Sequence, residues 1–328
     1  MERNEQFEAM RQKHFAATGR DLYVDVPLST VALNHRPLGI IAPDVMPILP
    51  VQKQSGFVTE FFRKEMLRTE RSRRSPGTEA NRVTRDVGSR SYFCDNYALK
   101  SGVTIEDYHN ADPVKRAVLF DNAAKFVKHK LDLGWEGRIA SLISTSNVGS
   151  SAGVASAWNG AGNPLGNINT AIDVVKDLSG VAPNRILFGE KAWKSFRRDS
   201  NVRNIINGTN NGGGYANEKQ VAALLDISKV IVSRASKNTA NEAAAEALSQ
   251  VIADHVLVYY SDDTVSDEMM AWALSHRWEV PGVPSMQAER LPYNAATKSW
   301  DVEVGYYQDE KVVAPELGYM LIAVNSST

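Results

Sequence analysis

One stretch of the chain matches a known catalytic pattern. Residues 149–153 read Gly-Ser-Ser-Ala-Gly, which fits the G-x-S-x-G sequence around the nucleophilic serine of many hydrolases. In those enzymes a strand enters the turn and a helix leaves it, so that the serine is held exposed. Here an amphipathic helical pattern precedes Ser151 and a polar stretch follows it. The sequence therefore favours a flexible loop, and a hydrolase built around Ser151 is the weaker alternative.

The other reactive residue types show no spacing that serves a known reaction. The glycine-rich stretch Asn207–Gly214 lacks the Gly-Lys-Ser/Thr ending of a phosphate-binding loop. The six histidines are scattered, with no H-E-x-x-H pattern and no cysteine partners of the kind that hold zinc. We therefore expect no metal, no cofactor and no enzymatic activity.

Length and composition are those of an ordinary globular protein. The chain has 328 residues and a formal net charge of −1, so it can bury one large or two moderate cores. The single cysteine, Cys94, excludes an intrachain disulfide and fits a reducing compartment. No apolar run is long enough to span a bilayer, and the charged N-terminus lacks the apolar stretch of a signal peptide. We therefore expect no membrane association.

The most informative segment is a long arm, Phe57–Tyr97. Its two ends alternate like strands, with Phe57, Thr59 and Phe61 on one face of the outgoing strand. Between them, residues 67–81 read LRTERSRRSPGTEAN and contain one large apolar residue, Leu67. A hairpin whose tip buries almost nothing is marginally stable in water. The arm is therefore predicted to lie on another copy of the chain.

The arm is also basic. Residues 61–90 hold nine Lys/Arg and four Asp/Glu, a local net charge of +5 in a nearly neutral chain. The arginines would suit either nucleic-acid phosphates or carboxylates on a neighbouring subunit. Interspersed glutamates and the lack of aromatic residues at the tip favour protein docking. The candidate inter-subunit contact residues are Phe61, Phe62, Arg63, Lys64, Arg68, Arg71, Arg73 and Arg74.

A long helix is predicted after the arm. Asp112 is a suitable N-cap, and Pro113 stands where its missing N–H costs nothing. Apolar residues then recur every three or four positions up to Leu142, and Gly134 and Gly137 are possible sites of a kink. The predicted core residues of this spine helix are Phe120, Val127, Leu131, Trp135 and Ile139.

The remaining segments predict short, mixed elements. The proline-rich stretch Tyr23–Pro50 is predicted to be an irregular strap, and residues 144–167 a surface connection. A capping box at Asn217 and Gln220 predicts a helix start, and the alanines of residues 243–248 favour a further helix. Residues 300–306 alternate strictly and predict a strand, and a final strand is expected at Tyr319–Val324.

In this order, the elements resemble the major capsid proteins of tailed bacteriophages, which share the Hong Kong ninety-seven capsid fold. The likeness is carried by IIAPDVMPILPV (40–51), SYFCDNYALKSGVTIEDYHNADP (91–113), LFDNAAKFVKHKLDLGWEGRIA (119–140), AWNGAGNPLGNINTAIDVV with GVAPNRILFGEKAWKSF (157–196), and the terminal VAPELGYMLIAV. Together these motifs span nearly the whole chain. The resemblance implies an α+β fold with an N-terminal arm, an extended β-hairpin loop, a long spine helix with an antiparallel sheet, and a mixed α/β axial domain.

The resemblance also implies a role for each segment. Residues 1–50 would be the N-terminal arm and 51–98 the extended loop over an adjacent subunit; 99–165 and 276–315 would form the peripheral domain, and 166–275 and 316–328 the axial domain. Hexamers and pentamers of the chain would form the icosahedral head of a virion. This head would be assembled in the host bacterial cytoplasm and would enclose double-stranded DNA on its inner face without sequence specificity.

Two departures from the family limit what the resemblance implies. Many relatives carry a long, cleaved N-terminal scaffold segment, whereas here the strap begins within a few dozen residues of Met1, so a separate scaffolding protein and a portal are the expected partners. Some relatives join subunits by Lys–Asn bonds; Lys64 is a conceivable donor, but nothing fixes its partner. The alternative within this fold is an encapsulin-like compartment that encloses a cargo enzyme.

Overall fold

The computed structural model describes residues 26–35, 37, 39–61, 68–70, 72–83, 87–207, 214–241, 244–262, 270–279 and 285–325. These residues belong to two compact units. The first unit comprises Met1–His35, Ala98–Lys128 and Gly282–Tyr306, and the second comprises Arg36–Tyr97, His129–Pro281 and Tyr307–Thr328. The predicted division into arm, loop, peripheral and axial parts has other boundaries than these two units, and it stays a prediction.

The first unit is built from three α-helices and a small set of antiparallel strands. Its elements are α2 (Val26–Asn34), β4 (Asp95–Thr104) from Ala98 on, α5 (Ile105–Asn110), the 3₁₀ turn Pro113–Lys115, the first half of α6 (Arg116–Leu142), β12 (Gln287–Arg290) and the first half of β13 (Ser299–Val312). β12 pairs antiparallel with β13. The Ser29 hydroxyl donates to the Ala288 carbonyl and accepts its N–H at 3.3 and 3.0 Å, which fixes α2 on β12.

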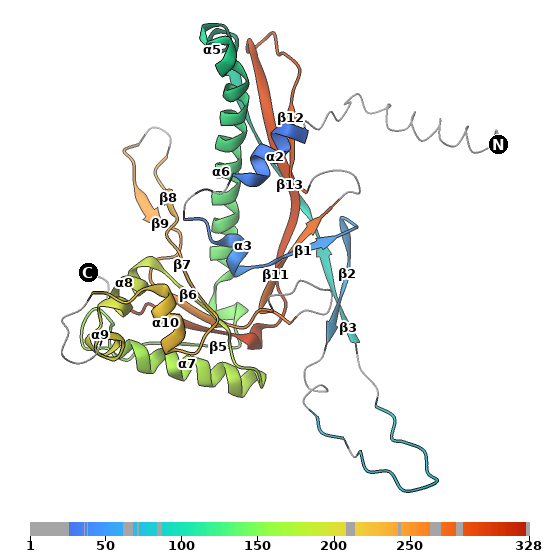
Figure 1. Cartoon of the computed structure of the whole chain (residues 1–328), viewed down its shortest axis with the longest axis vertical. Coiled ribbons are helices and arrows are strands. Elements are labelled where there is room, and N and C mark those ends of the chain that lie inside the picture. The colour runs from blue at the N-terminus through green and yellow to red at the C-terminus, as the bar shows by residue number, and fades with distance from the viewer. Residues whose placement is uncertain are drawn as a thin grey trace. The chain divides into compact units, whose positions relative to one another are not determined.

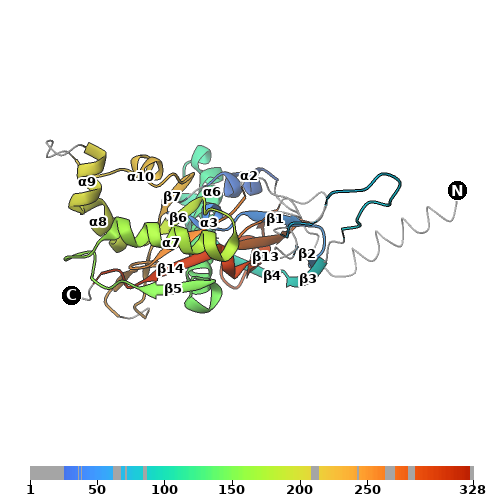
Figure 2. The ribbon, with the colours of Figure 1, turned by 90° about the horizontal axis from the view of Figure 1, so that it is seen from below.

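The second unit contains a five-stranded sheet in the order β5-β14-β10-β6-β7. The strands are β5 (Ser150–Gly153), β6 (Arg185–Phe188), β7 (Lys229–Val232), β10 (Val256–Tyr259) and β14 (Gly318–Ile322). Every residue of β6 and β10 is buried, as expected for central strands covered on both faces. Figure 2 shows α7 (Pro164–Ser179) running along β14.

Three further helices and two hydrophobic clusters accompany this sheet. The helices are α8 (Glu190–Arg198), α9 (Ser200–Asn207) and α10 (Glu218–Leu224). One cluster, which includes Phe188, Trp193 and Phe196, covers one face together with α7, α8 and α10. The other includes Trp272 and Tyr259, and it joins the sheet to the second half of α6 and to the short helix α3 (Ala42–Val45).

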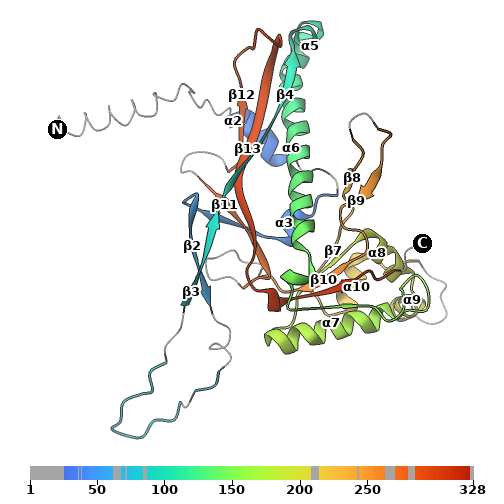
Figure 3. The same cartoon turned by 180° about the vertical axis from the view of Figure 1, so that it is seen from behind.

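A second sheet of this unit contains β1 (Ile48–Val51), which pairs parallel with β11 (Ala273–Trp278), and β11 in turn pairs antiparallel with the second half of β13. A two-stranded ribbon is formed by β2 (Ser55–Phe61) and β3 (Val87–Phe93), in a register that places Phe57 opposite Ser91. A small hairpin is formed by β8 (Ser236–Asn238) and β9 (Leu248–Gln250). Figures 1 and 3 show the ribbon and the described part of its loop extending away from the other elements of the second unit.

Most long elements lie where the sequence predicts them. The spine helix α6 runs over 27 residues and continues through Gly134 and Gly137. Asp112 stands at the N-cap of the preceding 3₁₀ turn, although its side chain makes no capping hydrogen bond. The capping box of Asn217 and Gln220 is confirmed in both directions. Residues 300–306 lie in β13 with Val302, Val304 and Tyr306 buried, as their alternation predicts.

Three local predictions are wrong. The described residues of 243–248 are not helical, and Leu248 instead opens β9. The stretch 144–167 is not only a connection, because it contains β5. The strap is more regular than its prolines suggest, since it holds α2, α3 and β1. In each case pairing or packing with distant residues overrides a local propensity.

Candidate inter-subunit contact site

The tip of the arm is fully exposed in the described residues. Every residue of 68–70 and 72–83 is exposed, and Arg68, Arg73 and Arg74 lie here. Arg68 pairs with Glu70 at 3.0 Å, between side chains that are themselves 74% and 47% exposed. Such an exposed pair contributes little to stability, so the contact with Glu70 does not hold Arg68 in a fixed position.

A single turn organises the tip. The Thr78 N–H and hydroxyl both donate to the Ser75 carbonyl, at 3.2 and 2.8 Å, and Arg74 donates to the Thr78 carbonyl. Gly77 has φ +79°, a left-handed conformation that glycine adopts without strain. Of the other predicted contact residues, Phe62, Arg63, Lys64 and Arg71 lie outside the described residues. Phe61 ends β2, and its side chain also lies outside the description.

One face of the ribbon is anchored to β11 and β13. Tyr92 is buried and stacks on His276 of β11, with ring centroids 5.2 Å apart and planes 5° apart. The Phe93 N–H donates to Asp309 Oδ2 at 2.9 Å, and Lys311 Nζ donates to the Ser91 carbonyl at 2.6 Å. These contacts fix the base of the arm on β11 and β13, which no sequence signal predicted.

The opposite face of the ribbon carries exposed aromatic side chains. In the antiparallel register Phe57 and Phe93 point to the same side as Ser55 and Ser91. Phe57 is 76% and Phe93 is 55% exposed, and Val83, in the loop, is 71% exposed. Exposed apolar side chains gathered on one side of an anchored strand pair are typical of an interaction surface.

A partly buried polar network supports the segment that follows the arm. Arg138 of α6 binds Glu310 of β13 with three N–O distances of 2.8 to 3.1 Å, and its guanidinium lies 3.7 Å from the ring centroid of Tyr97. Gln308 donates to the same carboxylate at 2.9 Å. A bidentate arginine–carboxylate pair has a fixed geometry, so this network sets the direction in which β4 leaves the ribbon.

The spine helix also fixes the strap, through one buried carboxylate. Glu136 is 1% exposed, and its Oε2 accepts the N–H groups of Ile41 and Ala42 at 3.1 and 3.0 Å. Burial raises the pKa of the Glu136 carboxyl to about 7, although both hydrogen bonds act to lower it. The predicted spine core residues Phe120, Val127, Leu131, Trp135 and Ile139 are all buried.

The thiol of Cys94, at the base of the arm, is expected to be unreactive. Cys94 is fully buried, and burial together with the neighbouring Asp309 carboxylate raises the pKa of its thiol to about 11. The thiolate is the reactive form, so native chain at pH 8 is expected to react with a maleimide or a disulfide reagent far more slowly than chain unfolded in urea. Equal rates for the native and unfolded chains would contradict this burial.

The described residues were predicted to include neither a nucleophilic serine site nor a metal site, and the geometry of each can be compared with that expectation. Ser151 lies inside β5, paired in parallel with β14, and not on a strand-to-helix turn, so the geometry of a nucleophile elbow is not met. Among the residues that the structure describes, no group of three or more His, Cys, Asp or Glu side chains is placed to hold a metal ion. No described helix has both the length and the apolar character needed to cross a membrane.

Comparison with known proteins finds similarity to two phage proteins. No family model matches the chain. The chain is 26% identical to the major capsid protein of Burkholderia phage BcepMu over 182 residues, which are 53% of this chain and 57% of that protein. It is 22% identical to the major capsid protein of Pseudomonas phage JBD67, over 90% of this chain and 95% of that protein.

Solved structures extend the similarity to the fold. A phage-related protein from Bordetella bronchiseptica RB50 superposes with a TM-score of 0.74 at 19% identity, over 94% of this chain and 99% of that one. The capsid of cyanophage P-SCSP1u superposes with a TM-score of 0.53 at 13% identity, over 86% and 87% of the two chains. The chain has the Hong Kong ninety-seven-type capsid fold.

This capsid fold confirms the predicted fold class and the resemblance to phage major capsid proteins. The fold alone does not separate a virus from a compartment, because an encapsulin from Synechococcus elongatus also superposes with a TM-score of 0.53, at 13% identity over 90% of each chain. The two curated sequence relatives are both phage capsid proteins. Together the comparisons support a structural role in a phage capsid over the encapsulin alternative.

Proposed function

We propose that the chain is the major capsid subunit of a tailed phage, and that it assembles with copies of itself into the closed shell that encloses the double-stranded DNA genome. The observation that carries the proposal is the arm, whose base is anchored on β11 and β13 and whose outer face and tip are exposed. The names of the curated relatives support the same role. This role requires no catalytic residue and no cofactor.

Assembly through the arm would work by multivalency. Each contact between an arm and a neighbouring subunit is weak by itself, but in a closed shell every subunit makes several contacts at once, so the effective affinity greatly exceeds that of any one contact. Contacts that repeat around closed symmetry axes form hexamers and pentamers and do not grow into open fibres.

The other partners and the location follow from the same proposal. A separate scaffolding protein and a portal would direct assembly in the host bacterial cytoplasm, and the finished shell would be part of the virion. The formal net charge of −1 gives the whole subunit no general attraction to DNA phosphates, so the genome would be retained by enclosure. Within the arm, protein docking is favoured over DNA binding because Glu70 and Glu79 lie among the exposed arginines.

Electron microscopy of the purified protein tests the proposal. Negative staining is expected to show closed shells of uniform diameter, formed by the chain alone or together with the scaffolding protein of its phage. Shells isolated from infected cells are expected to protect double-stranded DNA from nuclease. A homogeneous enzyme cargo in place of DNA would favour the encapsulin alternative, and a monomer that never assembles under either condition would contradict a capsid role.

A further inference from the structure

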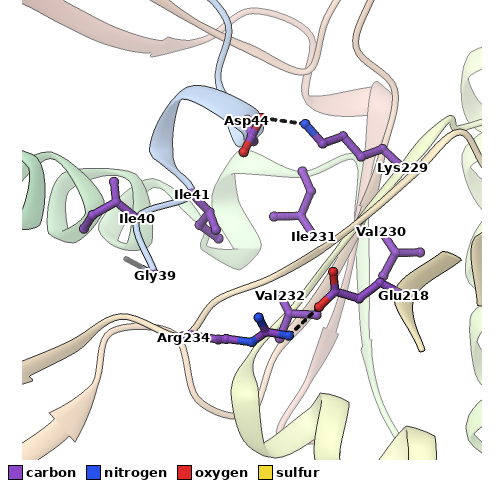
Figure 4. A pocket seen from close by; sticks show the side chains of 10 residues that line it. All are labelled: Gly39, Ile40, Ile41, Asp44, Glu218, Lys229, Val230, Ile231, Val232 and Arg234. Carbon is purple, nitrogen blue, oxygen red and sulfur yellow. Dashed lines mark hydrogen bonds and ion pairs between the residues drawn. The ribbon is translucent and has the colours of Figure 1, made fainter. Parts of the chain in front are cut away.

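The side chain of His276 is buried at the base of the arm. It is 2% exposed, and neither of its ring nitrogens has a hydrogen-bond partner among the residues that the structure describes. Buried polar groups in folded proteins are nearly always paired. By contrast, even the more exposed charges in the groove beside β7 are paired, Arg234 with Glu218 among them (Figure 4). A proton added to the His276 ring would create a buried cation, which is costly unless it is paired.

The imidazole of His276 lies against the arm. Tyr92 of β3 stacks on it, with ring centroids 5.2 Å apart and planes 5° apart. Gly56, which faces Tyr92 across the ribbon, leaves room for this stack, because a side-chain carbon there would lie 2.9 Å from the Tyr92 hydroxyl. The Cys94 thiol donates to the His276 carbonyl at 3.5 Å. The contact between the ribbon and β11 thus centres on one titratable side chain.

The charged groups that face His276 come from β13 and β3. Asp309 lies opposite His276 in the antiparallel register, and Lys311 follows two residues later on the same face. Arg90 of β3 is the third such group. On its other side, β1 places an apolar residue, Leu49, beside His276. The surroundings of the ring thus include one carboxylate and two cations.

The carboxylate is already used to hold the arm. Asp309 Oδ2 accepts the Phe93 N–H at 2.9 Å, and the same oxygen lies 3.2 Å from Lys311 Nζ. A protonated His276 would therefore either stay unpaired or compete with Phe93 for this oxygen. Both results weaken a contact that fixes the ribbon on the sheet.

The electrostatic surroundings favour the neutral ring. Burial lowers the pKa of the His276 imidazole below its ordinary 6.5. The cations Lys311 and Arg90 act in the same direction, and Asp309 opposes them without reversing the shift. The ring consequently binds a proton more weakly while the arm is seated than after the arm has lifted and the ring is hydrated. By linkage, the contact is strongest above pH 6.5 and weakens as the pH falls below this value.

We propose that His276 acts as a pH-sensitive latch for the arm: protonation of its imidazole in mild acid releases the base of the arm from β11 and β13, while the rest of the second unit stays folded. The latch acts within one subunit. Only its effect on a shell, in which released arms would lose contacts with neighbouring subunits, rests on the proposed function.

Cys94 reports on the latch, because it is the only cysteine of the chain, is fully buried and lies in the base of the arm. The unassembled full-length chain is treated with 4,4′-dithiodipyridine, a thiol reagent that also reacts in mild acid. Its rate is divided by that of the urea-unfolded chain at the same pH, which removes the titration of the thiol itself. Between pH 7.5 and pH 5 this ratio is expected to rise about tenfold, with the far-ultraviolet circular dichroism unchanged.

Three variants test whether His276 is the titrating group. His276→Phe keeps a ring that can stack on Tyr92 but cannot titrate, so its ratio is expected to stay constant within about twofold over this range. His276→Gln is expected to give the same flat profile, and it replaces the phenylalanine variant if that one does not fold. His255→Gln is the matched control. Burial also lowers the pKa of His255, but this residue directly precedes β10 of the other sheet, so its variant should keep the wild-type rise.

Three results would overturn the latch. The first is a ratio that stays flat in the wild type. The second is the wild-type rise in His276→Phe or His276→Gln, which would assign the titration to another group. The third is a rise that follows a loss of the circular dichroism signal, which would mean that the whole chain unfolds. All three are measured on unassembled subunits, so they are independent of whether the chain forms shells.

Discussion

Replacing Glu136 by glutamine is expected to remove a large pH dependence from the stability of the chain. Burial raises the pKa of this carboxyl from its ordinary 4.5 to about 7. Between these two values the folded chain binds more protons than the unfolded chain, so the free energy of unfolding falls as the pH rises. Glu136 alone is expected to lower it by roughly 3 kcal/mol from pH 4.5 to pH 7, with no further change above pH 7.

Urea unfolding of both proteins at several pH values between 4 and 9 measures this effect. Other titrating groups are common to the two proteins, so the difference between their curves isolates Glu136. Glutamine keeps an oxygen that can accept the N–H groups of Ile41 and Ala42. Glu136→Leu removes that acceptor and is expected to destabilise the chain at every pH by about 1–3 kcal/mol. A difference curve that is flat for glutamine would show that the native carboxyl titrates normally.

Elements set by local signals could be predicted from the sequence. The spine helix is defined by a proline at its start and a regular apolar spacing over many turns, and α6 lies where that spacing places it. The capping box of Asn217 and Gln220 and the alternation of β13 are equally local. The order of such elements was enough to reach the capsid fold.

Features that depend on distant partners could not be predicted. Glu136 accepts hydrogen bonds from Ile41 and Ala42, which lie 95 and 94 positions earlier in the sequence. No periodicity distinguishes Glu136 from an exposed glutamate on the same helix. The stacking of the Tyr92 ring on His276 likewise depends on the pairing of β11 with β13. In residues 243–248 the alanines favour helix. In the structure, however, the Thr239 N–H and hydroxyl both donate hydrogen bonds to the Ala247 carbonyl, next to the β8–β9 hairpin. For the tip of the arm, the sequence indicated exposure but not the anchored base.

Deletion of Leu67–Asn81 is expected to abolish stable shells while leaving a soluble, folded subunit. The described residues of this segment are exposed, so their loss removes almost no packing from the subunit. The base of the arm should remain, since Tyr92, Phe93 and Lys311 hold it independently of the tip. The melting temperature should therefore be unchanged within about 2 °C, whereas the fraction of protein that sediments as shells should fall to near zero.

A second variant separates the charge of the tip from its shape. Arg68→Gln, Arg73→Gln and Arg74→Gln together keep the length of the loop and remove three positive charges. If the arginines bind carboxylates of a neighbour, this variant should assemble weakly, and its assembly should depend less on salt than that of the wild type. If they bind DNA, empty shells should form normally and only DNA retention should become weaker, with a reduced salt dependence. Normal, stable shells from the deletion variant would show that the tip has no part in assembly, because the deletion removes every contact that the tip can make.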